Sequence, residues 1–408
     1  MEKVKTISIS LMLMVCLCLL FIAPSSLIRA DHINELYEVR TPGYKSVNRN
    51  HLPPLGSISE ARYVLQDGIY VNPKASDSGK AVINIVGDLM CHTDQQKVAK
   101  KNNTFNFNEN FYFVKDIFKK SDFVIGNLET MLSQTAPYRY ERPTIDNKPH
   151  LNAPATYLDA LKFAGVDCFA MANNHNVDTG YQGMVETNGH IDRYDFMRTG
   201  LFTNSEESRY IIAEVNGIKI AIFSYATYYN TKDRFLTKQG RDVLLNYYSK
   251  EKAETEIAEA KAKGAEFVLV NIHWGTEYVN YENDLQRRYA KELADAGADY
   301  IAGSHPHAVQ PYDIIVAEDG RSVPVIYSLG NFISSMSREV CLDNFIVKLT
   351  LERLPDGEIS ITDGYIPCHI MDKYQNKRYA TVPQAAGTAN AIRIAKILGD
   401  KFAAISDF

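Results

Sequence analysis

The chain has 408 residues, of which 45% are hydrophobic and 23% are charged, and its formal net charge is −5. This composition is ordinary for a globular protein, and the length suits one large α/β domain or two average domains. The acidic balance argues against a nucleic-acid partner, which would require a basic face, but it leaves room for a local basic pocket.

The first 30 residues predict an export signal. A short basic start precedes an apolar run from Ile7 to Ala23, and Pro24 follows it;. The run of roughly 17 residues is near the lower limit for crossing a bilayer. A cleaved signal peptide and a retained membrane anchor are therefore both open, with a slight preference for the anchor. Either places the rest of the chain on the extracellular face of the membrane or outside the cell.

Three further segments are predicted after the signal. Residues 31–79 are rich in Pro, Asn, Ser and Gly without a sustained period, which is typical of a linker or wrapping segment;. Residues 80–370 form one continuous run of strand and helix patterns, and residues 371–408 predict a C-terminal helical extension. Beyond the signal, Cys91, Cys168, Cys341 and Cys368 match no metal or redox spacing, so free thiols and disulfides are both open;.

Strand and helix patterns alternate along the central run. Apolar strands are predicted at 81–87, 122–126, 167–172, 219–225, 266–272, 299–303 and 323–328;. Helices are predicted at 108–120, 154–164, 180–197, 247–263 and 282–296;. This alternation predicts a layered α/β fold with a largely parallel sheet.

Two turn signals and one long connection modify that pattern. Asn216-Gly217 lies between two apolar runs and predicts a hairpin, so the sheet should be mixed;. Pro355-Asp356-Gly357 predicts a second hairpin between 344–351 and 358–362. The connection 131–153 is long enough to be functional or disordered.

Polar groups that bind cations follow five of the predicted strands. These groups are Gly87-Asp88, Gly126-Asn127-Leu128-Glu129, Asn173-Asn174-His175, His273-Trp274-Gly275 and His305-Pro306-His307. Open α/β sheets bind ligands outside the carboxyl ends of their strands. Imidazoles and carboxylates together suit zinc, iron, manganese or nickel, and no nearby cysteine pair indicates a thiolate zinc site. The sequence therefore predicts a metallohydrolase outside the cell.

Each carboxylate has a structural alternative. Asp88 could ligate a metal or cap the next segment, and these interpretations are evenly matched;. His92 shares a face with Asp88 if that segment is helical, although a surface histidine is at least as good an explanation. Glu129 could bridge two cations or form a surface salt bridge. Asn127 is interpreted as stabilising its turn.

The histidine motifs carry the strongest local signal. Pro306 holds His305 and His307 in an extended chain, so their imidazoles can converge on one metal or on two adjacent metals;. Before them, His273 ends an almost wholly apolar strand. Trp274, the only tryptophan, is expected to wall the site. Glu277 could orient an imidazole, and solvent exposure is its simpler alternative.

The remaining candidates are weaker when taken singly. An Asn-His pair at a strand end suits Asn174 as a carbonyl ligand and His175 as an acid, and Asp178 is interpreted as a helix N-cap;. In the long loop, Arg139 and Arg142 could each clamp a carboxylate or phosphate, against the alternative of solvated loop residues. The segment 327–332 is interpreted as a tight turn packed by aromatic residues.

Taken together, six ordered motifs resemble the bacterial capsule-synthesis CapA/PgsA family. They are Gly87-Asp88, Asn127-Leu128-Glu129, Ala172-Asn173-Asn174-His175, His273-Trp274-Gly275-Thr276-Glu277-Tyr278, Gly303-Ser304-His305-Pro306-His307 and Tyr327-Ser328-Leu329-Gly330-Asn331-Phe332. The resemblance covers about residues 80 to 335. It implies a role with poly-γ-glutamate or another anionic cell-surface polymer, and an α/β/β/α four-layer sandwich with mixed sheets, as in calcineurin-like metallophosphoesterases.

The resemblance also implies roles for individual residues. Asp88 and His307 would bind one divalent metal, Glu129 would bridge, and Asn174, His273 and His305 would bind a second metal. His175 would protonate the leaving group or steady the transition state. The metals would be manganese, iron or zinc.

One position departs from the wider superfamily pattern of Asp-x-His at the first motif. Position 90 is Met, and His92 is the nearest alternative. Two functions therefore stay open: a dinuclear-metal hydrolase, or a non-catalytic accessory subunit that holds the polymer or membrane synthase subunits.

Overall fold

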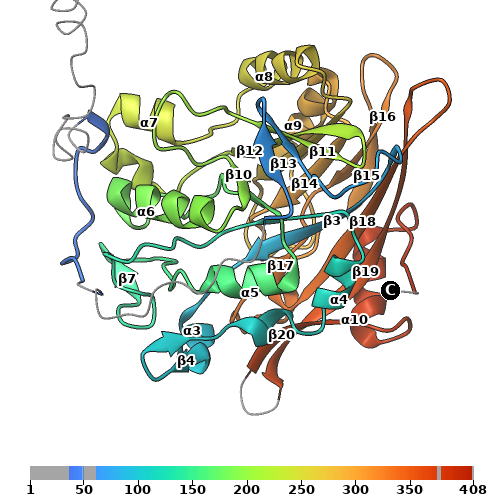
Figure 1. Ribbon diagram of the computed structural model, residues 1–408. Coiled ribbons are helices and arrows are strands. Elements are labelled where there is room, and N and C mark those ends of the chain that lie inside the picture. Colours follow the sequence, from blue (N-terminus) through green and yellow to red (C-terminus); the bar gives the residue numbers. More distant parts are fainter. Residues whose placement is uncertain (1–35, 48, 50–60, 375–377, 407–408) are drawn as a thin grey trace, which may run out of the picture.

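Two eight-stranded sheets lie face to face at the centre of the fold, and helices lie on their outer sides (Figure 1). The computed structural model describes residues 36–47, 49, 61–374 and 378–406. The predicted export signal at residues 1–30 lies outside the described residues. No helix in the described part of the chain combines the length and the apolar character that a membrane span needs.

The first sheet is mixed. Its strands, from one edge to the other, are β1 (Val64–Gln66), β2 (Ile69–Val71), β11 (Ile211–Val215), β12 (Ile218–Ala226), β13 (Phe267–His273), β14 (Tyr300–Ser304), β16 (Ser322–Ile326) and β15 (Tyr312–Val316). Strands β12, β13, β14 and β16 are parallel, whereas β11 pairs antiparallel with β12. Asn216 and Gly217 both have positive φ, which is the backbone conformation that a tight hairpin turn requires, so this predicted hairpin is confirmed;.

The second sheet has a parallel half and an antiparallel half. Its order is β10 (Met197–Thr199), β9 (Cys168–Ala170), β6 (Phe123–Asn127), β3 (Lys80–Leu89), β18 (Asp343–Arg353), β19 (Ile359–Tyr374) and β20 (Arg378–Pro383), and β17 (Asn331–Ile333) also pairs with β3. Strands β10, β9, β6 and β3 are parallel, and β18 to β20 run antiparallel. Two small hairpins lie apart from the sheets: β4 (Lys100–Lys101) with β5 (Thr104–Phe105), and β7 (Thr144–Ile145) with β8 (Lys148–Pro149).

Helices and short 3-10 turns connect these strands. The helices are α3 (Thr93–Ala99), α4 (Lys115–Lys119), α5 (Tyr157–Ala164), α6 (Gly180–Arg193), α7 (Lys238–Leu244), α8 (Lys250–Ala262), α9 (Asp284–Ala296) and α10 (Ala389–Leu398). The 3-10 turns are η1 (Asn108–Phe111), η2 (Lys232–Phe235) and η3 (Glu339–Cys341).

Three apolar cores define the four layers. Side chains alternate along each strand, so Ile220 and Ile222 of β12 face the core between the two sheets, whereas Ala221 and Phe223 face the core under α8 and α9;. On the other side, Phe169 of β9 packs in the third core with residues of α5 and α6. Helices therefore cover the outer face of each sheet, and the predicted α/β/β/α sandwich is confirmed.

All seven predicted strands occur within two residues of their expected limits. Four predicted helices also occur, as α5, α6, α8 and α9. The predicted helix 108–120 is instead divided into η1 and α4, although its apolar residues Phe111, Val114 and Phe118 do pack together in the core. The four cysteines are buried and free.

Strands that were not predicted occur in the segment expected to be a linker or wrapping segment and in the predicted C-terminal helical extension. Within 31–79, β1 and β2 form the edge of the first sheet, and Val39 N donates to the carbonyl oxygen of Phe235. Within 371–408, the end of β19 and all of β20 extend the second sheet before α10 begins. Strands β1 and β2 have three residues each, which is too short for an alternating pattern to be recognised in the sequence;.

Candidate metal centre

The carboxyl ends of strands from both sheets meet at one buried cluster. Asp88 lies on β3 and Glu129 lies just beyond β6, both in the second sheet, whereas His273 ends β13 in the first sheet. His305 and His307 follow β14 of the first sheet. Asp88 and Glu129 are fully buried, and the three histidines are at most 2% exposed. The structure thus brings together residues that are up to 219 positions apart in the sequence.

An unpartnered carboxylate oxygen lies at the middle of this cluster. Oε1 of Glu129 is buried and has no hydrogen-bond partner among the described residues. It lies 3.8 Å from Nε2 of His175, 3.9 Å from Nε2 of His273 and 3.8 Å from Nε2 of His307. Two ligand atoms bound to one cation at about 2.1 Å each lie roughly 3–4 Å apart. The separations around Glu129 Oε1 fit cations between these atoms.

The ligand atoms form three groups whose members lie within 4.8 Å of one another. One group contains Asp88, Glu129 and His307, and a second contains Glu129, His273 and His305. Glu129 belongs to both, as a bridging residue must. Glu277 forms a third group with His305 and His307.

Asn174 faces the second group. Its Oδ1 lies 3.2 Å from His273 Nε2. Its amide nitrogen donates to Oδ1 of Asn230 at 3.2 Å, which leaves the carbonyl oxygen turned toward the histidines. This is the orientation that a carbonyl ligand needs.

Neighbouring polar side chains fix the orientation of these groups. Asn127 Nδ2 donates to Oδ1 of Asp88 at 2.8 Å and to Oε2 of Glu129 at 3.2 Å. Asn331 Oδ1 lies 2.9 Å from Nδ1 of His307. Such partners on the far side of a ligand are what set its direction in metal sites.

The two central imidazoles have partners of their own. Ser304 Oγ lies 3.0 Å from Nδ1 of His273. The hydroxyl of Tyr228 lies 2.5 Å from Nε2 of His305. The backbone of His305 has a φ of 98° and that of His307 has 57°, conformations that cost energy for residues with a Cβ;. The fold thus holds both imidazoles in place against local preference.

The pKa shifts of the clustered side chains indicate that a bound cation would stabilise them. Burial raises the pKa of the Glu129 carboxyl well above its usual range, and the nearby carboxylates Asp88 and Glu277 add to the effect. Burial and neighbouring imidazoles hold the pKa values of His273 and His305 well below the usual range. The imidazoles are therefore neutral, which is the form that binds a metal.

His175 and Asp178 form a buried pair. His175 Nδ1 lies 2.6 Å from Oδ2 of Asp178, and Asp178 also accepts from Leu151 N and from Lys232 Nζ. Burial alone would raise the pKa of the Asp178 carboxyl, but His175 and Lys232 outweigh it and hold that pKa well below its usual range. The interpretation of Asp178 as an N-cap was wrong. Thr179, and not Asp178, is the residue before α6, and the Asp178 carboxylate faces inward to His175 and Lys232.

A cavity of about 340 Å³ borders the cluster. Among the residues that line it are His92, Arg139, Lys148, His175, Lys232, Glu277 and His307. His92 is the residue before α3, and Ser335 N lies 3.5 Å from its Nδ1. The cavity thus gives access to His175 and His307 from one side.

Two candidate residues lie elsewhere than the sequence suggested. Arg142 is exposed and does not line this cavity. Trp274 does not wall the site either. Its indole is buried in the core under α8 and α9, and Nε1 donates to the carbonyl oxygen of Tyr327 at 2.8 Å.

The sequence pattern missed several contacts of the cluster. Asn331 lies in the segment interpreted as an aromatic turn, and Ser304 precedes His305; both are polar residues at strand ends, a signal that was available. Tyr228 and Lys232 follow β12, but nothing in their spacing connects them to histidines more than 50 positions away.

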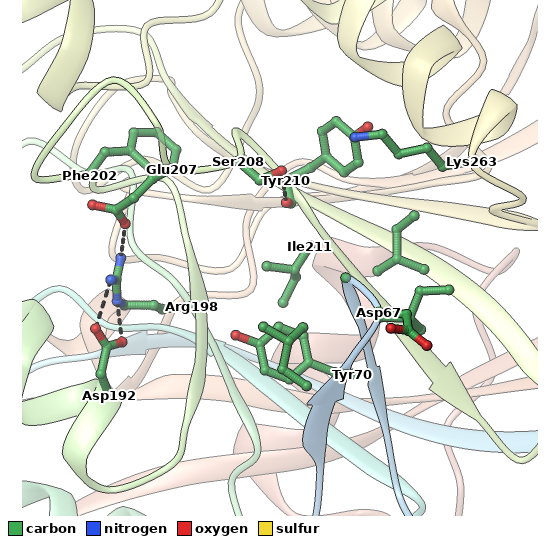
Figure 2. A pocket seen from close by; sticks show the side chains of 14 residues that line it. Asp67, Tyr70, Asp192, Arg198, Phe202, Glu207, Ser208, Tyr210, Ile211 and Lys263 are labelled. Atoms are coloured by element: carbon green, nitrogen blue, oxygen red, sulfur yellow. Dashed lines mark hydrogen bonds and ion pairs between the residues drawn. The ribbon is translucent and has the colours of Figure 1, made fainter. Parts of the chain in front are cut away.

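A larger cavity of about 690 Å³ lies apart from the cluster, and Figure 2 shows its lining. It is bounded by the β1–β2 hairpin, by β11 and by the segment after β10, and no candidate site residue lines it. Its arginine is already neutralised, because Arg198 contacts Asp192 and Glu207 (Figure 2). This cavity is not part of the candidate site.

Comparison with known proteins finds several relatives of this chain. The chain is 30% identical to the PGA biosynthesis protein CapA of Bacillus subtilis (strain 168) over 286 residues, 68% of this chain and 70% of the relative. It is 29% identical to the capsule biosynthesis protein CapA of Bacillus anthracis over 307 residues, 73% of this chain and 70% of that protein. A probable polyglutamine synthesis accessory protein of Mycobacterium tuberculosis (strain ATCC 25618 / H37Rv) is 26% identical over 228 residues, 52% of this chain and 56% of that protein.

Part of this structure is similar to solved structures. The calcineurin-like phosphoesterase YfkN from Bacillus subtilis has a TM-score of 0.43 and 16% identity, covering 70% of this chain and 90% of that chain. The sulfate thiohydrolase SoxB of Thermus thermophilus has a TM-score of 0.40 and 11% identity, covering 72% of this chain and 57% of that chain.

The sequence comparison extends to a whole family. The family of bacterial capsule synthesis proteins PGA_cap matches residues 82–336, which include all five strand ends that build the cluster. The chain belongs to the bacterial capsule synthesis protein PGA_cap family.

Proposed function

We propose that this protein is a hydrolase with two divalent metal ions that acts in the synthesis of a poly-γ-glutamate or similar anionic capsule polymer. The observation that carries the hydrolase proposal is the buried Oε1 of Glu129, which has no hydrogen-bond partner among the described residues and lies within 4 Å of three imidazole nitrogens. The family and the names of its relatives support the place in capsule synthesis.

The residues present fit two cations. Asp88 and His307 would hold the first, and Asn174, His273 and His305 would hold the second, with Glu129 between them. Imidazole, carboxylate and amide donors suit manganese, iron or zinc. Met90 supplies no ligand of this kind. His92 and Glu277 both line the cavity beside His307 and could complete the first site.

Two bound metals in such sites act as Lewis acids and neutralise charge that develops on the substrate. The contribution of the protein itself centres on His175. Asp178 holds Nδ1 of this imidazole, so the other ring nitrogen, Nε2, is directed toward the cluster and is free to give a proton to a leaving group;. The scissile bond would be a phosphoester or an amide of the polymer.

A second function has support from the relatives. The Mycobacterium tuberculosis relative is named an accessory protein. In that case the metals would serve binding or stability, and the protein would hold the polymer or membrane synthase subunits.

Metal analysis of the purified full-length protein, followed by turnover assays, separates the two functions. We expect about two equivalents of metal, and chelator-sensitive cleavage of a generic phosphodiester or a γ-glutamyl amide. Bound metal without turnover on any substrate of either class would favour the accessory function. Absence of bound metal after incubation with manganese, iron and zinc would contradict both assignments.

The same proposal places the protein on the extracellular face of the cell membrane or outside the cell. Its support is the basic start and the apolar run of residues 7–23;. Protease accessibility on intact cells tests this placement, with a cytoplasmic protein as the control. Protection equal to that of the control would contradict it.

A further inference from the structure

Three basic residues and one acidic residue, Glu277, line the cavity beside the metal cluster. Arg139 and Lys148 reach this cavity from the loop 131–153, and Lys232 reaches it from η2. His175 and His307 of the candidate centre line the same cavity. A substrate that reaches the metals through this cavity therefore passes these three cations.

One guanidinium nitrogen of Arg139 is hydrogen-bonded, and the other two have no hydrogen-bond partner in the described part of the chain. Its Nη1 donates to the carbonyl oxygen of His150. Its Nε is buried and has no hydrogen-bond partner among the described residues, and no described carboxylate forms an ion pair with the guanidinium. Burying a cation without a partner costs free energy, so such groups are normally paired. Burial accordingly lowers the pKa of Arg139, with Asp178 opposing it.

The free nitrogens of Arg139 form one edge of the guanidinium. Nε and Nη2 lie side by side in the planar group, and two parallel N–H bonds from one edge match the two oxygens of a carboxylate or phosphate. Because Nη1 already bonds to the backbone of His150, the edge that lacks partners is the one suited to an oxyanion.

Lys148 is the second available cation, whereas Lys232 is not available. Lys148 is exposed on β8 and makes no side-chain hydrogen bond or ion pair with the described residues. Lys232, by contrast, is buried and neutralised by Asp178. Two of the three cations are therefore free to bind a ligand.

The loop that carries Arg139 is anchored at several points. Glu186 of α6 accepts hydrogen bonds from Ser133, Gln134 and Thr135. Asn152 donates to the carbonyl oxygens of Ser133, Ala136 and Pro137. A loop that is already anchored loses little conformational entropy when a ligand binds, so the free-energy cost of ordering it is small.

We infer that Arg139 and Lys148 bind an oxyanion of the substrate, a carboxylate or a phosphate, beside the metal centre. This inference rests on the proposed function, because it takes the cavity to be the substrate cavity. It goes further in requiring a charged group on the substrate in addition to the scissile bond, and in assigning Arg139 as the residue that recognises it.

Binding to the full-length protein after chelator treatment tests the inference without catalysis. The probes are a short γ-glutamyl oligopeptide, inorganic phosphate, and the same oligopeptide with its carboxylates esterified, measured by calorimetry. Arg139→Gln should weaken binding of at least one anionic probe by about 10- to 100-fold, because it removes hydrogen bonds between two charged groups. The anionic probe that loses more affinity identifies the group recognised.

Matched variants control for charge and folding. Arg142→Gln removes a cation from the same loop outside the cavity and should leave binding unchanged. Lys148→Gln should weaken binding by a few-fold, and less at high salt, because an exposed cation is screened. Arg139→Lys keeps the charge and loses the planar edge, so its affinity should lie between wild type and Arg139→Gln. Unchanged metal uptake would show that the centre is intact.

The outcomes separate this inference from the proposed function. Equal affinity of wild type and Arg139→Gln for both anionic probes would overturn the inference even if turnover depends on metal. Equal affinity for the esterified and the free oligopeptide, with no phosphate binding, would overturn it as well. Loss of anion binding in Arg139→Gln, together with no turnover in wild type, would uphold the inference and contradict the hydrolase.

Discussion

His175 Nδ1 lies 2.6 Å from Asp178 Oδ2, and on the opposite oxygen of the same carboxylate lies the ammonium group of Lys232. A fully buried carboxylate thus joins a candidate acid to a buried lysine. Asp178 orients the imidazole. Burial alone would raise the pKa of the Asp178 carboxyl, but His175 and Lys232 together hold that pKa well below its usual range;.

Breaking this buried pair should destabilise the fold. Asp178→Asn leaves Lys232 buried without a countercharge, and losing one partner of such a pair costs about 3–5 kcal/mol. Lys232→Met should cost a similar amount. The double variant should be less destabilised than the sum of the two, by a coupling of at least about 1 kcal/mol. Denaturant unfolding gives the free energy of unfolding of all three variants. If the losses of the two single variants simply add in the double variant, the two groups do not interact.

His175→Ala should separate chemistry from metal binding. General acids contribute about 10²–10⁴-fold in rate, so turnover should fall by that factor on a substrate with a poor leaving group while the metals stay bound. On a nitrophenyl ester the loss should be smaller, because a good leaving group needs little protonation. Equal losses on both substrates would instead assign His175 to charge stabilisation or to metal binding.

Metal content should follow the grouping of the ligands. His307→Ala should lose about one equivalent of metal, from the first site. His273→Ala and His305→Ala should each lose about one equivalent from the second site. Glu129→Gln should reduce both, since Glu129 belongs to both groups. Elemental analysis measures the content, with His190→Ala on α6 as the control outside the cluster. Wild-type stoichiometry in the four cluster variants would refute the ligand assignment.

Stability should fall in mild acid, in part through His150. Burial lowers the pKa of His150 to about 4, although Asp178 and the bond to the Arg142 carbonyl oppose this. Below its usual pKa near 6.5, the unfolded chain binds a proton that the folded protein does not. Stability from this group is thus present above about pH 6.5 and is lost down to pH 4, by about 3 kcal/mol at about 1.4 kcal/mol per pH unit.

The variant His150→Gln isolates this contribution. Its amide can still donate to the Arg142 carbonyl oxygen but does not titrate, so its free energy of unfolding should fall less between pH 6.5 and 4 than that of wild type. Parallel curves for the two proteins would exclude His150 as the source.

Gly87 should tolerate no side chain. A Cβ at this position would lie 1.9 Å from the carbonyl oxygen of Gly330, which also accepts from Asp88 N. Gly87→Ala should push β17 away from β3, cost about 1–3 kcal/mol and reduce metal content by displacing Asp88. Gly189→Ala on α6 is the matched control, because nothing lies within 4 Å of its Cβ, and it should stabilise the protein by about 0.4–1 kcal/mol;. Metal content equal to wild type in Gly87→Ala would argue against this coupling.

The sequence by itself determined the seven central apolar strands, the layered α/β class and the strand ends that carry the candidate ligands. Long strands such as β13 can be predicted from the sequence, because a strand that is buried on both faces is a continuous run of apolar residues. A polar residue such as His273 then marks the end of the strand. The candidate ligands were predicted because carboxylates and imidazoles follow several apolar strands, and the carboxyl ends of parallel strands meet at one edge of a sheet.

Only the tertiary structure decided how those ends combine. Pairing of β3 with β6 and of β13 with β14, and the packing of the two sheets, place Glu129 between His273 and His307, and no local pattern encodes that encounter. The same holds for the orientation of each side chain. Arg139 and Arg142 are both arginines of one predicted loop, yet one lines the cavity and the other faces solvent. The loop is anchored by residues distant in the sequence, such as Glu186, and no local pattern encodes those contacts.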